Sequence, residues 1–212
     1  MSAVLGAPRR RERLRLPVMR GPARWPALLL GCVAAAAGIT ALLAAGLGVG
    51  PYDVLITGVA TRQGVTFGTA SVLVSVLATA LGWRLGGQVG RGTVATAVLV
   101  GPLVDAWSWL LPLEASALPT RVVLLGGAIV LIAFGLSLVV AASLGPGPLE
   151  VVTLGLTHRG VPLRWARTVL EGSVLAVGWA LGGAVGVGTI VVALTIGHGL
   201  ALFVPSAVAT RG

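Results

Sequence analysis

Six long runs of apolar residues follow one another along the chain, separated by short connections that contain glycine, proline and arginine. The runs occupy residues 26–47, 66–83, 93–112, 121–144, 163–181 and 188–206. Each approaches the length of roughly 20 residues that an α-helix needs to cross the hydrocarbon core of a bilayer. The pattern therefore predicts an all-α, polytopic membrane protein with about six transmembrane helices.

Composition places the chain in the same class. Of its 212 residues, 56% are apolar and only 10% are charged, and the mean hydropathy is +1.00. A water-soluble fold seldom carries that balance. The 32 glycines, together with abundant alanine, indicate helices that pack backbone to backbone in lipid, where small side chains let helices approach.

Positive charge is concentrated near the N-terminus. The net charge is +9, and seven of the fifteen arginines lie within residues 1–25. A basic tail can bind nucleic acid, but one directly before an apolar span more often holds the cytoplasmic side and contacts anionic lipid. We therefore expect residues 1–25 to form a disordered, basic cytoplasmic tail without a nucleic-acid partner. We expect the first helix to be retained, not cleaved as a signal peptide.

The two halves of the chain resemble each other. Residues 82–93 align with residues 178–189 at an offset of 96, and nine of these twelve positions are identical. Residues 48–54 align with residues 145–151 at an offset of 97, in a match that includes a proline and an acid two residues after it. Glycines could align by chance, but tryptophan, threonine, proline and acid in one order would not. The chain therefore carries an internal repeat.

Three predicted crossings in each half make the repeat an inverted one. The first repeat covers residues 26–112, the second covers residues 121–206, and residues 207–212 form a short cytoplasmic tail. Because three is odd, the second half must enter the membrane from the side opposite to the first. We therefore predict two inverted three-helix repeats with both termini in the cytoplasm.

The arginines test this orientation independently of the repeat. Positions that carry arginine in one half carry an uncharged residue in the other: Arg84 and Arg91 match Ala180 and Val187, and Arg164 and Arg167 match Gly68 and Ser71. With the N-terminus inside, about thirteen arginines are cytoplasmic and only Arg62 and Arg121 are external, as the positive-inside rule requires. Positive charge therefore follows the predicted cytoplasmic side and not the repeat.

The combination of motifs over residues 26–205 resembles the YczE/YyaS/YitT group of bacterial integral membrane proteins, and most of all its YczE-like branch. The resemblance rests on the Gly-x-Gly-Pro-x-Asp/Glu element in each half, on the spacing of Arg167 and Glu171, and on the glycine-rich run from Gly178 to Ile190. Asp105, which follows Gly101 in the third run, fits the group as well.

Two positions depart from the pattern of the group. Tyr52 stands where tryptophan or phenylalanine is common, and Glu150 stands where aspartate is frequent. The resemblance implies residence in a bacterial cell membrane as a multi-pass protein. It implies no settled substrate or reaction.

Two acids and one histidine fall inside the predicted spans, namely Asp105, Glu171 and His198. A charged group at the centre of a bilayer costs about 2.5–3.5 kcal/mol or more. One interpretation is a shared polar site between the halves, where the two acids hold a cation or a proton and His198 relays it. The alternative is structural: Arg167 pairs with Glu171 one helical turn away, while Asp105 and His198 hydrogen-bond neighbouring backbone.

Two short segments at matching places need a separate interpretation. Residues 53–61 and 150–159 follow Pro51 and Pro148 and are too short to span a bilayer. A proline followed by an acid is typical of a helix start, so Asp53 and Glu150 could cap interfacial helices. The alternative is a pair of re-entrant segments, one from each side, which in transporters points to the binding site.

No catalytic constellation is visible. The sequence has no nucleophile–base arrangement and no metal-ligand spacing, so we expect neither an enzyme nor a cofactor or metal site. Two functional hypotheses stay open. The first is a transporter or permease, or a subunit of one, that moves a small solute or a proton through a polar cavity between the halves. The second is a scaffold or regulator that is closed inside and binds a membrane protein partner.

Overall fold

The computed structural model describes the backbone of residues 19, 21–113, 115 and 117–203, with side chains through Thr195, and this part of the chain is built from helices. The elements are η1 (Gly21–Ala23), α1 (Arg24–Ala45), α2 (Pro51–Gln63), α3 (Phe67–Arg84), α4 (Arg91–Leu110), α5 (Leu118–Ala142), α6 (Pro148–His158), α7 (Leu163–Ala180) and α8 (Val187–Phe203). Most of the predicted tail over residues 1–25, and all of residues 207–212, lie outside the described range.

Each of the six predicted runs coincides with a helix, and α2 and α6 are the two short segments between them. Within the described residues, four helices are long and apolar enough to cross a membrane: α1 together with η1, α3, α4 and α5. The all-helical class and the membrane-spanning character are therefore confirmed. That α7 and α8 also span stays a prediction, since α7 carries three charged residues and α8 is described over 17 residues.

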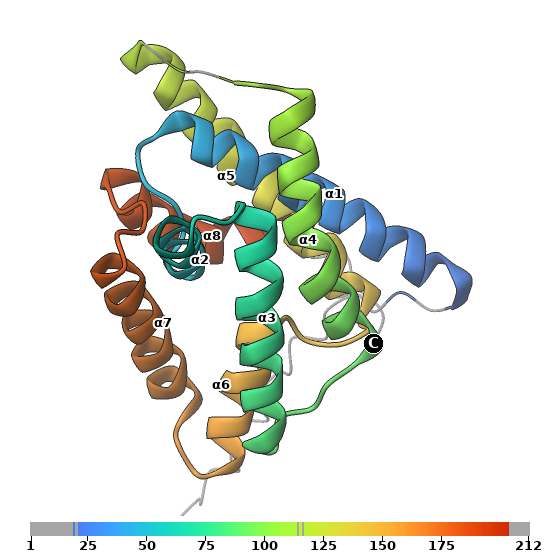
Figure 1. The fold of residues 1–212 in the computed structure, drawn as a ribbon. Coiled ribbons are helices and arrows are strands. Elements are labelled where there is room, and N and C mark those ends of the chain that lie inside the picture. The colour runs from blue at the N-terminus through green and yellow to red at the C-terminus, as the bar shows by residue number, and fades with distance from the viewer. Residues whose placement is uncertain (1–18, 20, 114, 116, 204–212) are drawn as a thin grey trace, which may run out of the picture.

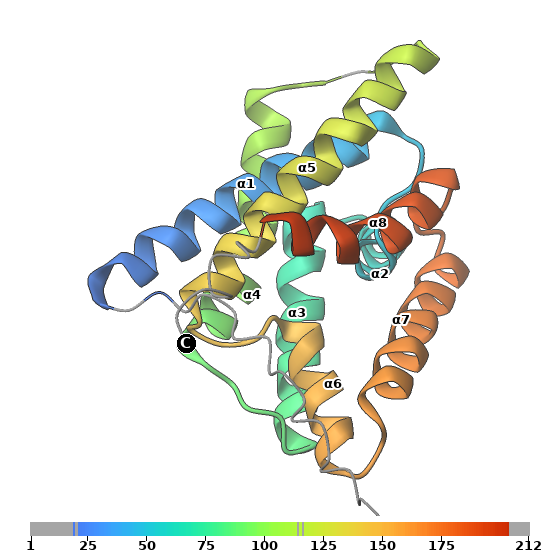
Figure 2. The same ribbon diagram turned by 180° about the vertical axis from the view of Figure 1, so that it is seen from behind.

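Helices α1 and α5 run side by side in opposite directions through the middle of the molecule (Figures 1 and 2). They approach each other closely at two glycines: a Cβ on Gly31 would lie 2.7 Å from the carbonyl oxygen of Gly135, and a Cβ on Gly135 would lie 2.6 Å from the carbonyl oxygen of Gly31. At one end of the pair, Arg24 donates a 2.8 Å hydrogen bond from Nε to the carbonyl of Ala142, where α5 ends. A cation at this position also complements the helix dipole.

The short helices pack crosswise, each against a helix of the other half. Helix α2 packs against α7, and α6 packs against α3. A Cβ on Gly178 would lie 2.5 Å from the backbone nitrogen of Leu55, and a Cβ on Gly82 would lie 2.6 Å from that of Val152. Only glycine therefore fits at these two matched positions without displacing a helix backbone.

The connections before α4 and α8 also make matching contacts in the two halves. The backbone N–H of Gly90 donates to Thr93 Oγ1 at 3.1 Å, and that of Gly186 donates to Thr189 Oγ1 at 3.2 Å. Both threonines are buried. Each following turn then reaches across to the other half, through Gly92 N–H to the carbonyl of Leu144 at 2.9 Å and Gly188 N–H to that of Leu47 at 2.7 Å. The contacts made by one half are thus repeated by the other.

Candidate functional site

Asp105 lies on α4 and holds the beginning of α3. Its Oδ1 accepts a 2.8 Å hydrogen bond from the backbone N–H of Gly68, the second residue of α3. The first N–H groups of a helix have no partner within the helix, so a carboxylate here satisfies one of them. This arrangement is the structural alternative that the sequence left open for Asp105.

Glu171 lies on α7 and pairs with Arg167 of the same helix. Arg167 Nε donates to Glu171 Oε1 at 2.7 Å, and both side chains are exposed in the isolated chain, by 66% and 37% respectively. The i, i+4 geometry is the one that the spacing predicts. The two charges therefore largely neutralise each other on one face of α7.

The structure does not bring Asp105 and Glu171 together. Asp105 contacts the start of α3, Glu171 is occupied by Arg167, and α4 and α7 lie on opposite sides of α3 in both views (Figures 1 and 2). The side chain of His198 lies outside the described residues, although its backbone belongs to α8.

The paired short segments form regular helices that begin at their prolines. Gly50 and Gly147 precede them in extended conformation, with φ of −61° and −66°. As glycines they supply no side-chain cap. Instead the acid of each first turn folds back towards the glycine before the helix. A Cβ added to Gly50 would lie 3.2 Å from the Asp53 carboxylate, and a Cβ added to Gly147 would clash with the Glu150 carboxylate. Each negative charge therefore lies at the positive end of a helix dipole.

The two short helices end at opposite ends of α3. Helix α2 ends at Gln63, and three residues separate it from the start of α3 at Phe67. Helix α6 ends where α3 ends, because His158 Nδ1 lies 2.7 Å from the carbonyl oxygen of Gly86, and Arg159 donates to the carbonyl of Arg84 at 3.2 Å. Since α3 is long enough to span the membrane, α2 and α6 end on opposite sides of the molecule.

The start of α2 lies halfway along α3. The hydroxyl of Tyr52 lies 3.0 Å from that of Ser75, which is the ninth of the 18 residues of α3. Burial raises the pKa of Tyr52, the Ser75 hydrogen bond opposes the rise, and the negative charges of Asp53 and Glu150 add to it. Carboxylates from both halves therefore act on one hydroxyl, that of Tyr52.

These groups define a candidate site, the Tyr52 site, made of Tyr52, Ser75, Asp53 and Glu150. Asp53 is half-buried and Glu150 is exposed. Burial raises the pKa of Asp53, a group that lies outside the four helices long enough to span. Within the described residues, no group of three His, Cys, Asp or Glu side chains is arranged to hold a metal ion. The site is thus an acid–hydroxyl cluster that can exchange a proton.

Sequence reasoning identified Asp53 and Glu150 but not the hydroxyls beside them. In the sequence alone, Tyr52 is only a departure from the pattern of a family. The signal that could have found it is its position, since it is the single tyrosine of the chain and stands between the proline and the acid of the repeated element. Ser75 carries no comparable signal in the sequence.

Comparisons with known proteins agree with the membrane character of the fold. The model of a family described as a family of unknown function (DUF6198) matches residues 22–205. The chain is 27% identical over 190 residues to the uncharacterized membrane protein YczE of Bacillus subtilis, covering 87% of each chain. It is 31% identical over 164 residues to an uncharacterized protein of Haemophilus influenzae, covering 76% of this chain and 74% of that protein. It is also 25% identical over 183 residues to the uncharacterized protein YyaS of B. subtilis, covering 83% and 90% of the two. No solved structure matches the chain.

Proposed function

Since the chain belongs to the DUF6198 family and is a membrane protein of the YczE-like type, we propose that it moves protons across the membrane through the Tyr52 site. The observation that carries this proposal is the placement of α2 and α6. They end at opposite ends of α3, and the first turn of α2, with Tyr52 and Asp53, lies level with the middle of that helix.

Opposed short helices of this kind are a recurring device of secondary transporters. Their first turns meet near the bilayer midplane at the interface of two repeats, and the helix ends and nearby polar groups hold the substrate or the coupling ion. An ionisable group at that depth costs several kcal/mol and is most often functional. Asp53, a half-buried carboxyl next to Tyr52 in the first turn of α2, is the group in this site best suited to bind and release a proton.

The proposal includes an inverted arrangement of six spanning helices, with α1, α3 and α4 in one half and α5, α7 and α8 in the other. The reciprocal contacts support it, because α2 packs on α7 as α6 packs on α3. The arginine distribution supports cytoplasmic termini in a bacterial cell membrane. In this arrangement α2 and α6 are re-entrant helices that enter from opposite sides.

Proton flux in liposomes tests the function. Purified wild-type protein, reconstituted with a pH-sensitive dye inside and a potassium diffusion potential, should acidify the vesicles. Asp53→Asn should lower the initial rate at least tenfold, because the amide cannot carry a proton, and Glu150→Gln should lower it severalfold. Asp105→Asn and Glu171→Gln serve as matched controls and should keep the wild-type rate, since both acids already have structural partners.

Either of two outcomes would contradict the proton proposal. A well-folded wild type without proton flux would remove the transport function and favour the scaffold alternative, which a cross-linking search for a membrane partner would then pursue. If Asp105→Asn lost proton flux while Asp53→Asn kept it, the proton-binding site would lie on α4 and not at Tyr52.

Cysteine labelling tests the re-entrant arrangement separately. In a Cys32→Ser background, which removes the one native cysteine, Gln63→Cys and Arg159→Cys place a thiol at the end of α2 and just past the end of α6. We expect a membrane-impermeant maleimide to label position 63 only from outside and position 159 only from inside. Labelling of both positions from the same side would show that the two short helices are not opposed.

A further inference from the structure

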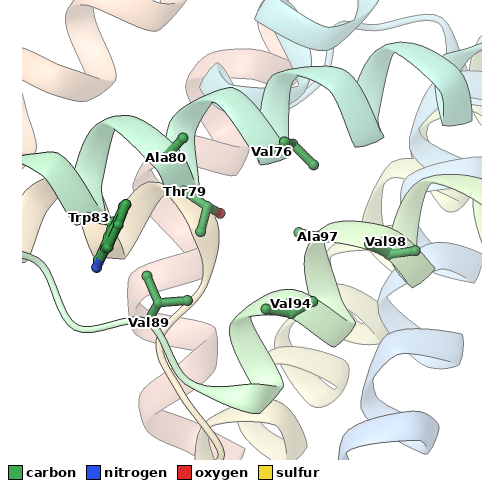
Figure 3. Close-up of a pocket in the computed structure, with 8 residues that line it drawn as sticks. All are labelled: Val76, Thr79, Ala80, Trp83, Val89, Val94, Ala97 and Val98. Carbon is green, nitrogen blue, oxygen red and sulfur yellow. The ribbon is translucent and has the colours of Figure 1, made fainter.

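A groove lies between α3 and α4. Its volume is about 420 Å³, and Figure 3 shows that side chains of both helices line it while the connecting loop closes one end. The lining residues are Val76, Thr79, Ala80, Trp83, Val89, Val94, Ala97 and Val98. The hydroxyl of Thr79 is already bonded to the carbonyl of Ser75 at 2.7 Å. The groove therefore offers an almost entirely apolar surface.

The groove opens sideways from two helices that are long enough to span. Val76, Trp83 and Val94 are 49%, 68% and 54% exposed. In a spanning helix such exposed apolar side chains face hydrocarbon and not water. What reaches the groove from that side is the acyl chain of a lipid, and its volume falls within the range of about 300–1,000 Å³ typical of sites for small ligands.

Positive charge gathers at the closed end of the groove. Arg84 follows Trp83 at the end of α3, and Arg91 begins α4 two residues after Val89. Arg159 also reaches this end, where it donates to the carbonyl of Arg84. Among the described residues the single ion pair is that of Arg167 with Glu171, so neither arginine beside the groove has an acidic partner.

The other half lacks this combination. The positions that match Arg84 and Arg91 in the repeat are Ala180 and Val187. The charges at this end of the groove are therefore not a by-product of the repeated sequence. Tryptophan beside them is typical of the boundary between hydrocarbon and headgroups.

We propose that the α3–α4 groove binds an anionic phospholipid, with one acyl chain between the two helices and the phosphate headgroup between Arg84 and Arg91. Apolar contact along the groove and charge attraction at its end are both needed, so a zwitterionic lipid with the same chains binds more weakly. This inference is independent of proton transport, because it uses neither Asp53 nor Glu150.

Lipid titration followed by native mass spectrometry tests the proposal on the purified full-length protein in detergent. Wild type should bind one phosphatidylglycerol at least tenfold more tightly than phosphatidylcholine of the same chain length. Arg84→Gln combined with Arg91→Gln should remove that preference. Ala80→Trp, which fills the groove from an exposed position, should weaken both lipids. Arg62→Gln combined with Arg164→Gln removes two charges elsewhere and should leave the affinity within twofold of wild type.

The controls separate the possible sources of a signal. Equal binding of the two lipids by wild type, or equal loss in the control variant, would show only general attraction to a basic surface and would overturn the proposal. Glycerol phosphate, which carries the headgroup without acyl chains, should not compete below millimolar concentration. If it did, the site would be one for a free phosphate compound instead of a lipid. Thermal unfolding without added lipid should be unchanged in every variant that is compared.

Discussion

Gly135→Ala should lower the free energy of unfolding by about 1–3 kcal/mol, the usual cost of an extra methyl group in a packed interface. The added Cβ would lie 2.6 Å from both the backbone nitrogen of Ala35 and the carbonyl oxygen of Gly31, so α1 and α5 would have to separate. Because neither contact is with a flexible side chain, local adjustment cannot relieve the clash. A larger residue, as in Gly135→Leu, should prevent folding.

The control for this prediction is Gly127→Ala on the same helix. Nothing lies within 4 Å of a Cβ at that position, and alanine favours a helix over glycine by up to about 1 kcal/mol. The variant should therefore unfold at the wild-type temperature or slightly above it. Thermal unfolding followed by intrinsic tryptophan fluorescence, with size-exclusion chromatography in detergent, measures both proteins. Equal destabilisation of the two variants would show that the α1–α5 contact is not as close as described.

Gly178→Ala should displace α2 and thereby reduce proton flux more than any other single change outside the Tyr52 site. A Cβ on Gly178 would lie 2.5 Å from the backbone nitrogen of Leu55, in the first turns of α2 beside Asp53. The free energy of unfolding should fall by about 1–3 kcal/mol. The flux should fall at least tenfold, because a shift of about 1 Å in a functional group is enough for such losses.

Gly172→Ala is the matched control on α7, since a Cβ there meets nothing within 4 Å. It should keep both stability and flux. Parallel measurement of liposome flux and thermal unfolding on both variants decides the question. If Gly178→Ala kept full flux at reduced stability, the position of α2 would not matter for transport, and the proposed role of its first turn would be wrong.

The sequence located the helices well because each apolar run is interrupted by residues that end helices for local reasons. The predicted run 121–144 became α5, which begins three residues earlier at Leu118 because Pro119 suits the first turn of a helix. Helix α1 ends where Gly46 adopts φ of +61°. Such stop signals are local and are therefore visible in the chain alone.

The packing between the two halves was harder to predict from the sequence. The repeat predicted that the two short segments correspond, but not that each packs against the opposite half, because that depends on where Gly82 and Gly178 meet backbone far away in sequence. The hydrogen bond between Tyr52 and Ser75 joins α2 to α3 within the first half, and no local signal predicts it, so only the two acids of the site could be identified in advance. For Asp105 and Glu171 the sequence leaves a structural and a functional alternative open, and spacing cannot choose between them.

The crosswise packing also determines when α2 can make its contacts during synthesis of the chain. Thr57 on α2 accepts a hydrogen bond from the backbone N–H of Ala184, which lies 127 residues later in the chain. At a synthesis rate of about 5–20 residues per second, roughly 6–25 s pass before that partner leaves the ribosome. Throughout this interval α2, with Asp53 in its first turn, has no α7 to pack against. Until then α2 has its contacts with α3 alone, and its packing is complete only once α7 has been made.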